Sequence, residues 1–376
     1  MQTMHPTLLV GPADWDPRQM PRVEFEERLA ALWQSHPNAG GAIVYGNSSD
    51  YAALAYLTNF TPKLEAALAL IPRHGKAQLL IGGGVNMVPA AKPLTFVENL
   101  APLREATKTA AAWAGALQGG GALLLIGGDA MPLGMRGAFD QALGSDIKVE
   151  VADRTLQAGM RRKRPRELRA MGEACDILAA AATALRDAVL ARKNVTDCIL
   201  TAEHAALQRG AQDVRSLFSL DRGRTLRPFD LPIPDRRDPL QVYLAARHDG
   251  YWAEGFVRVA STKDALQEKV DGILDAMVTS AKPGQSCREL RGIVDQGRGA
   301  FQLHPLAATM LGSSIGLARD EAPALTPDSG TRLEAGAVYS LRAGLIDDTG
   351  AGAVASAMVA VTPNGPDVLW RHGASS

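Results

Sequence analysis

The chain is poor in cysteine and carries no net charge. Its three cysteines, Cys175, Cys198 and Cys287, are scattered along 376 residues and form no CxxC pair. They predict buried thiols in a reducing compartment rather than a disulfide framework or metal ligands. Lysine plus arginine and aspartate plus glutamate both number 40, so the formal net charge is zero. This balance gives no electrostatic basis for binding nucleic acid or a membrane surface.

Long apolar runs and leader signals are also missing. No apolar stretch approaches the roughly 20 residues that span a bilayer, and the first residues lack a basic-then-apolar leader pattern. We therefore expect a cytoplasmic protein. The glycine-rich turns at residues 82–84 and 127–128 match neither G-x-G-x-x-G nor a P-loop. They predict tight turns at strand ends, and no cofactor is expected.

The first part of the chain alternates between helical and strand patterns. Residues 24–36 predict a helix, because Phe25, Leu29 and Leu32 recur at helical spacing. Short apolar runs predict buried strands at residues 41–45, 67–72, 77–81 and 123–128. This order predicts an α/β domain over residues 1–157.

The remaining residues, 158–376, predict a second domain, and the whole chain an α+β fold. A long helix follows the basic run at 160–166, and Thr196 is expected to cap the next helix. Ser286 and Glu289 have the spacing of a capping box. Strands are expected at residues 240–246, 250–260, 337–342 and 355–361, and a further helix at 265–280.

The most informative stretch is residues 312–323, a glycine-framed segment ending in Asp320, Glu321, Ala322 and Pro323. It has the frame of a metal-peptidase signature in which Ser313 stands where a ligand histidine is expected and Asp320 where a second histidine is expected. Four more segments occur with it in a fixed order, at residues 250–258, 283–284, 333–344 and 361–365.

Together these five segments resemble the creatinase/methionyl aminopeptidase/prolidase family, which is the M24 family. The resemblance implies a creatinase-like N-terminal domain at 1–157, a pita-bread domain at 158–376 and a homodimer. It also implies that the family's five metal-ligand positions fall on residues of other kinds. These positions are Tyr243, Glu254, Ser313, Arg342 and Ser356.

Of these five, only Glu254 is a side chain suited to a divalent ion, and Arg342 places a permanent cation where a bridging carboxylate belongs. We therefore expect no metal in this site. Creatinase is the precedent within the fold, since it hydrolyses a small amidino compound without metal. By analogy, Asp320, Glu321 and Glu254 are the candidate catalytic acids and bases, with Asp320 the first choice.

Arg342 has two interpretations at this stage. It forms a buried ion pair with Glu254, or it anchors the carboxylate of a small anionic substrate. The other candidate substrate-binding residues are Ser313, Tyr243, Ser356, Trp252 and Arg227. Arg227 lies with Arg222 and Arg224 in the segment where the resemblance places a substrate-facing loop. The histidines His248 and His304 are expected to be surface or hydrogen-bonded residues rather than bases.

These observations leave several functions open. The first is a metal-independent hydrolase that cleaves a C–N bond in a small carboxylate-bearing substrate. The second is a non-catalytic protein that binds a ligand or a partner on a peptidase scaffold. A lyase acting on a small carboxylate is a lesser alternative, and a metal enzyme with relocated ligands is the least favoured.

Overall fold

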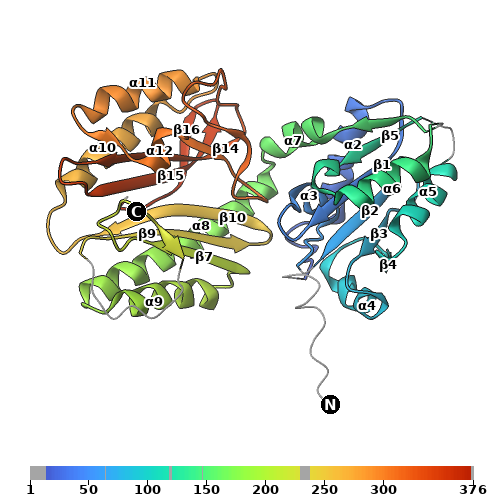
Figure 1. The fold of residues 1–376 in the computed structure, drawn as a ribbon, viewed down its shortest axis with the longest axis horizontal. Coiled ribbons are helices and arrows are strands. Elements are labelled where there is room, and N and C mark those ends of the chain that lie inside the picture. Colours follow the sequence, from blue (N-terminus) through green and yellow to red (C-terminus); the bar gives the residue numbers. More distant parts are fainter. Residues whose placement is uncertain (1–13, 64, 118–120, 146, 229–237, 374–376) are drawn as a thin grey trace, which may run out of the picture. The chain divides into compact units, whose positions relative to one another are not determined.

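The chain folds into two units, residues 1–160 and residues 161–376. A computed structural model describes residues 14–63, 65–117, 121–145, 147–228 and 238–373 (Figure 1). Both units combine helices with sheets, so the expected α+β fold is confirmed. The boundary expected at residue 157 lies inside helix α7 (Asp153–Arg161), which continues to the junction of the units.

The first unit is built on one six-stranded sheet in the order β4-β3-β2-β1-β5-β6. Its strands are β1 (Ala39–Asn47), β2 (Ala66–Pro72), β3 (Gln78–Ile81), β4 (Asn99–Pro102), β5 (Ala122–Ile126) and β6 (Val149–Val151). Its longer helices are α2 (Arg22–Ser35), α3 (Ala52–Thr58), α5 (Ala106–Gly115) and α6 (Leu133–Leu143). The central strands are apolar on both faces because helices cover them, and Ile43, Leu68 and Leu125 lie in one core cluster.

In its described residues, the second unit contains two sheets and four long helices. Its first sheet has the order β10-β9-β7-β8, and its second runs β13-β12-β14-β15-β16 with β11 paired to β14. The strands of the first sheet are β7 (Asp213–Phe218), β8 (Arg227–Pro228), β9 (Leu240–His248) and β10 (Tyr251–Val259). Those of the second are β11 (Gln302–Leu303), β12 (Gly312–Ser314), β13 (Glu321–Ala324), β14 (Val338–Ile346), β15 (Gly352–Thr362) and β16 (Gly365–Arg371).

These elements stack in four layers (Figure 1). Helices α8 (Pro165–Leu190) and α9 (Val195–Gln208) cover the first sheet, and α10 (Ala265–Ser280) with α11 (Cys287–Arg298) covers the second. The two sheets pack against each other through β10 and β15. Because side chains alternate along a strand, each strand sends one set of residues to its helices and the other set between the sheets.

Helix α8, with 26 residues, is the longest in the described chain. Its apolar residues lie on one stripe, which includes Met171, Ala174 and Leu178, and that stripe packs on β9 and β10. Its exposed positions include charged residues such as Arg169, Asp176 and Arg186 as well as small and apolar ones. None of the helices in the described part of the chain is both long and apolar enough to span a membrane.

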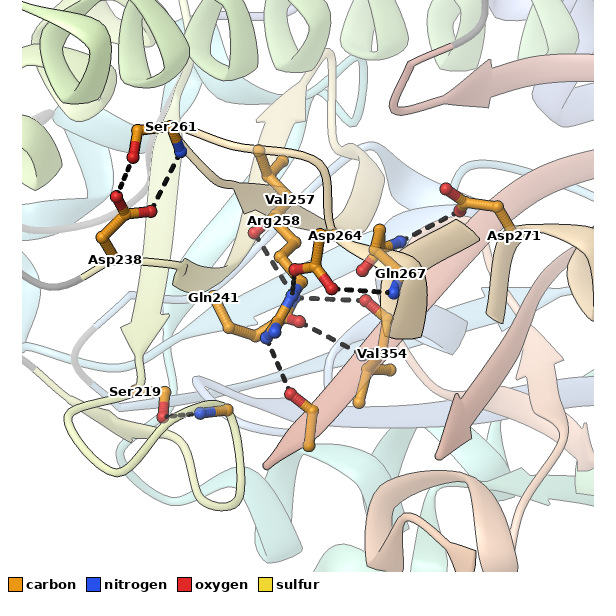
Figure 2. Close-up of polar contacts among 12 residues, drawn as sticks. Ser219, Asp238, Gln241, Val257, Arg258, Ser261, Asp264, Gln267, Asp271 and Val354 are labelled. Carbon is orange, nitrogen blue, oxygen red and sulfur yellow. Dashed lines mark hydrogen bonds and ion pairs between the residues drawn. The ribbon is translucent and has the colours of Figure 1, made fainter. Parts of the chain in front are cut away.

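A buried glutamine joins the two sheets. The Gln241 side chain on β9 donates from Nε2 to the Val354 carbonyl at 3.1 Å and accepts from the Val354 amide at 3.1 Å (Figure 2). It therefore gives β15 the same two hydrogen bonds that a neighbouring strand would give. Nearby, Arg258 donates to Asp264 at 2.6 Å and to the Gly352 carbonyl at 2.7 Å. These bonds fix how the sheets face each other.

The helix starts follow the expected capping chemistry, with one correction. Ser286 and Glu289 form the predicted capping box of α11. The cap of α9 is Asn194 and not Thr196, because the Asn194 side-chain oxygen accepts from the Asp197 amide at 2.8 Å. Asparagine is as good an N-cap as serine, and its position one residue before the helix is the one that capping requires.

Because β10 and β16 approach closely at Gly255, we expect any side chain at this position to destabilise the protein. A Cβ atom at Gly255 would lie 1.8 Å from Cζ3 of the buried Trp370 ring. We expect Gly255→Ala to lower the free energy of unfolding by about 1–3 kcal/mol or more, since a packed ring has no space to yield. Urea denaturation measures this. Gly272→Ala on α10 meets no atom within 4 Å and is expected to stabilise the helix by about 1 kcal/mol. Equal effects of the two substitutions would contradict the prediction.

Candidate functional site

The candidate site lies between the two sheets of the second unit. In β10, Trp252, Glu254 and Phe256 share one face, and across the ladder Tyr243 of β9 stands opposite Phe256. In the facing sheet, Arg342 of β14 stands opposite Ser356 of β15. The alternation of each strand therefore brings Tyr243, Glu254, Arg342 and Ser356 into one layer.

A polar chain crosses this layer. Arg319 donates from Nη1 to the Tyr243 hydroxyl at 3.3 Å, and that hydroxyl donates to Glu254 Oε2 at 2.6 Å. The other oxygen of Glu254, Oε1, lies 3.7 Å from Nη2 of Arg342. The ion pair between Arg342 and Glu254, one of the two interpretations of Arg342, is thus present. Both charges are buried, with side-chain exposures of 11% and 4%.

Tyr243 is held in its protonated form. Burial raises the pKa of its phenol well above the usual range, and the charge of Glu254 raises this pKa further, although Arg319 opposes the shift. The hydroxyl therefore remains a donor to Glu254 at neutral pH and an acceptor from Arg319.

The buried ion pair is incompletely hydrogen-bonded. Glu254 Oε1 and Arg342 Nε are both shielded from solvent and have no hydrogen-bond partner among the described residues. A separation of 3.7 Å is an ionic contact and too long for a good hydrogen bond. Buried groups of this kind are uncommon, and each requires an explanation such as a bound water, an ion or a catalytic use. The pair therefore retains unused hydrogen-bonding capacity.

Trp252 lies beside two guanidinium groups. The guanidinium carbons of Arg247 and Arg319 lie 5.3 and 5.6 Å from the centre of its ring, within cation–π range. Tyr251, the next residue, faces the helix side, where its hydroxyl donates to Glu167 of α8 at 3.0 Å. Trp252 thus lines the intersheet layer while Tyr251 packs behind it. No sequence pattern pointed to Arg319, although it is part of the segment at 312–323.

Asp320 is next to this layer and is exposed. Its Oδ1 accepts a hydrogen bond from the buried Ser313 hydroxyl at 3.1 Å. Two candidate residues from the sequence are therefore joined directly. Burial lowers the pKa of Arg319, but its hydrogen bond to Tyr243 and the charges of Glu254 and Asp320 outweigh this effect, so the pKa is raised.

Glu321 has a different environment from the one expected. Its Oε2 accepts from Lys163 Nζ at 2.5 Å, and its Oε1 accepts from the backbone amides of Leu317 and Ala318 at 2.8 and 3.4 Å. The Lys163 and Glu321 side chains are 1% and 7% exposed. This differs from the expectation that Glu321 transfers protons, because both oxygens are occupied in holding the loop before β13.

The two remaining candidate substrate-binding residues, Ser356 and Arg227, have different environments. The Ser356 hydroxyl accepts from the Phe256 amide at 2.9 Å and so connects β15 to β10. Arg227 is exposed on β8, the edge strand on the other side of the sheet from β10. Ser356 therefore has a structural bond, and Arg227 stands apart from the polar chain.

The two histidines are hydrogen-bonded residues, as expected. His304 is fully buried; its Nδ1 accepts from the Leu306 amide at 3.2 Å, and its Nε2 lies 2.9 Å from the Gly223 carbonyl. His248, at the end of β9, lies close to Glu173 and Asp249, and these three side chains could hold a metal ion.

Comparison with known proteins assigns the fold to a family. Residues 169–363, just over half of the chain, match the sequence pattern of metallopeptidase family M24. The chain belongs to this family. The assignment confirms the resemblance given by the five segments, and it supports an enzyme of the hydrolase type. A search of curated protein sequences found no match.

Several solved structures have a similar fold. The X-Pro aminopeptidase from Thermotoga maritima MSB8 is 18% identical with a TM-score of 0.76, covering 93% of this chain and 98% of that one. The prolidase from Pyrococcus horikoshii OT3 is 17% identical with a TM-score of 0.70, covering 91% and 97%. The N-terminal domain of FACT complex subunit SPT16 from chickpea (Cicer arietinum) is 12% identical with a TM-score of 0.65, covering 92% and 96%.

The buried pair Lys163–Glu321 predicts a strong coupling in stability. We expect Lys163→Met and Glu321→Gln each to lower the free energy of unfolding by about 3 kcal/mol, since each leaves one buried charge without its main partner. The double variant should lose clearly less than the sum of the two. Urea denaturation of all four proteins measures the coupling. The exposed pair Arg186 and Asp187 serves as the control, with an expected coupling below about 0.5 kcal/mol. If the losses of unfolding free energy in Lys163→Met and Glu321→Gln simply added in the double variant, the direct contact between the two side chains would be contradicted.

The buried His304 predicts a loss of stability in mild acid. Burial lowers the pKa of His304 below its ordinary value of 6.5. Below about pH 6.5, His304 therefore binds a proton in the unfolded chain but stays neutral in the native protein. The free energy of unfolding falls as the pH falls, by at most about 1.4 kcal/mol per pH unit. Urea unfolding of His304→Asn between pH 7 and 5 should show a smaller slope than the parent protein. The exposed His74→Asn should keep the parent slope, and a parent slope in His304→Asn would refute the assignment.

Proposed function

We propose that this M24 protein is a metal-independent hydrolase that cleaves a C–N bond in a small carboxylate-bearing substrate. The observation that carries the proposal is the polar chain Arg319–Tyr243–Glu254–Arg342, which occupies the layer where the family resemblance places metal ligands. Both ends of this chain, Arg319 and Arg342, are positively charged, which suits an anionic organic molecule.

The residues of this layer do not fit the divalent ions that the family name implies. Such ions require several carboxylate or imidazole donors converging on one point. Here the polar chain contributes one carboxylate, Glu254, whose two oxygens face Tyr243 and Arg342. A cation placed beside Glu254 would meet the positive charge of Arg342 at close range. The group of metal-type side chains found within the described residues lies elsewhere, at Glu173, His248 and Asp249.

Arg342 is the proposed anchor for the substrate carboxylate. Guanidinium groups bind carboxylates through two parallel hydrogen bonds. The unpartnered Nε of Arg342 and the loose contact of its Nη2 with Glu254 leave donors for such a bond. Arg319, which is partly exposed, adds a second positive charge to the same layer. A bound carboxylate would therefore complete the hydrogen bonding that the protein alone leaves incomplete.

Asp320 is the proposed general base. Its carboxylate is exposed and oriented by Ser313, so it can accept a proton from a water molecule that attacks the carbon of the C–N bond. The C–N bond then breaks, and the leaving nitrogen takes a proton returned by Asp320. Arg319, held in place by its hydrogen bond to the Tyr243 hydroxyl, provides the positive charge that would stabilise the negative charge developing on the atom bonded to the attacked carbon.

A non-catalytic role is the second candidate. The intersheet residues are nearly closed to solvent, with Tyr243, Glu254, Ser313, Arg342 and Ser356 all at or below 9% exposure. The fold also occurs in the N-terminal domain of FACT complex subunit SPT16, so it also exists in a subunit of a complex. Such a protein would bind a ligand or partner without turnover.

Binding of small carboxylates tests the anchor. We expect acetate, propionate or succinate to bind the parent protein, and Arg342→Ala to weaken this binding about 10- to 100-fold, the value of a charged hydrogen bond of 1.5–3 kcal/mol. Calorimetric titration measures the affinity. Arg342→Met combined with Glu254→Gln leaves no unpaired ion and should also lose binding, while the exposed Arg186→Ala should not. Parent-like binding by the Arg342 variants would refute the anchor.

Turnover separates the two candidate functions. N-acyl and N-amidino amino acids incubated with the protein should release amine or ammonia, and the rate should survive an excess of chelator. Asp320→Asn should lower the rate at least 100-fold while leaving carboxylate affinity within about twofold, because a base acts on the chemical step. Carboxylate binding without any turnover would favour the non-catalytic role. A rate abolished by chelator and restored by metal would refute metal independence.

A further inference from the structure

A second polar cluster lies on the helix side of the first sheet, away from the intersheet layer. Strands β9 and β10 are joined by the two-residue turn Asp249-Gly250, in which both residues have positive φ, 45° and 82°. This is the geometry of a tight hairpin turn. His248 ends β9 immediately before this turn, and α8 carries Glu173 beside it. Two elements distant in sequence thus meet at three metal-type side chains.

The spacing of these side chains suits a single metal ion. His248 Nε2 lies 3.2 Å from Glu173 Oε2 and 3.9 Å from Asp249 Oδ2, and the ligand atoms of all three residues lie within 4.8 Å of one another. Zinc binds nitrogen and carboxylate oxygen at about 2.0–2.2 Å, so two ligands of one ion are separated by about 3.0–3.5 Å. The 3.2 Å distance already fits, the 3.9 Å distance requires a shift of about half an ångström, and a pair at the 4.8 Å limit would have to close by about 1.3–1.8 Å.

The ring orientation of His248 presents the correct nitrogen. Its Nδ1 lies 3.4 Å from the Gly210 carbonyl, which can only accept a hydrogen bond. Nδ1 can therefore keep a proton directed at this carbonyl, which would leave the lone pair of Nε2 for a metal ion held between the ring and the two carboxylates. A backbone carbonyl that holds the second nitrogen is the usual support of a metal-binding histidine. Gly210 lies just after α9 and is independent of the cluster itself.

The charge of the cluster also favours a cation. Two carboxylates converge on one imidazole, so even a protonated ring would leave an excess of negative charge. The three side chains are only partly exposed, at 24% for His248, 37% for Glu173 and 30% for Asp249. Water therefore screens these charges incompletely, and a divalent ion would balance them.

We propose that Glu173, His248 and Asp249 form a binding site for a divalent transition-metal ion, which ties α8 to the β9–β10 turn. One imidazole and two carboxylates are a donor set suited to zinc or manganese and less suited to magnesium, which prefers oxygen alone. The exposed side of the cluster leaves the remaining coordination positions to water. The site is separate from the Arg342 anchor and does not depend on the proposed hydrolase chemistry.

Zinc binding to the chelator-treated 376-residue chain tests the site. We expect calorimetric titration to give one zinc per chain, with magnesium binding at least 100-fold more weakly. His248→Asn and Glu173→Gln should each weaken zinc binding at least 10-fold. Excess zinc should raise the melting temperature of the parent protein, because a ligand that binds only the folded state stabilises it, and this rise should be absent in both variants. His204→Asn on α9, an exposed histidine, should bind zinc as the parent does.

Three outcomes would overturn the proposal. Absence of zinc binding by the parent protein would overturn it directly, and so would parent-like affinity in His248→Asn, provided that circular dichroism shows the variant to be folded. Loss of zinc binding in Glu254→Gln with retention in His248→Asn would place the metal between the sheets. That last result would also refute the metal-independent function, whereas the first two would leave it standing.

Discussion

Buried charge between two facing sheets is the constraint on which the second unit depends. Glu254 and Arg342 stand on different sheets, and each would be costly to bury without the other. Their pairing requires the sheets to face each other in one alignment, and Gln241 and Ser356 fix that alignment by bonding across the gap. The helices on the outer faces then bury the apolar side chains of the same strands. The polar pairs between the sheets and the apolar packing against the helices thus both follow from the alternation of side chains along each strand.

The fold was largely predictable because it rests on local patterns. The helix at α10 and the capping box at Ser286 follow from spacing along a few residues. The meeting of Tyr243, Glu254 and Arg342 followed from the resemblance and from the side-chain period of two. The sequence did not show which partners the loop residues would choose. Lys163 and Glu321 are 158 positions apart, and no local pattern reports a contact of that range.

The same reasoning explains why Arg319 was missed. It lies in a loop rather than on a strand, so no periodicity assigns it to a face, and its contacts with Tyr243 and Trp252 come from the folding of residues 315–320. The shared fold gives no help here either, because a fold is conserved through its backbone while function depends on particular side chains. Arg319 and Lys163, two cations that contact residues of the segment 312–323 or of the candidate site, have different roles. Arg319 belongs to the polar chain of the candidate site, whereas Lys163 holds the loop before β13 through Glu321.

The ion pair between Lys163 and Glu321 has a consequence for the order in which the chain can fold. Lys163 lies at the start of the second unit and Glu321 in its last third, so the contact closes a loop that contains most of that unit. Contacts of such long sequence separation form slowly, because the chain loses the conformational entropy of closing the loop before the contact contributes any stability. During synthesis Lys163 leaves the ribosome long before its partner exists. The first unit can complete its own sheet in that interval, and the loop carrying Asp320 becomes ordered only when nearly the whole chain has been made.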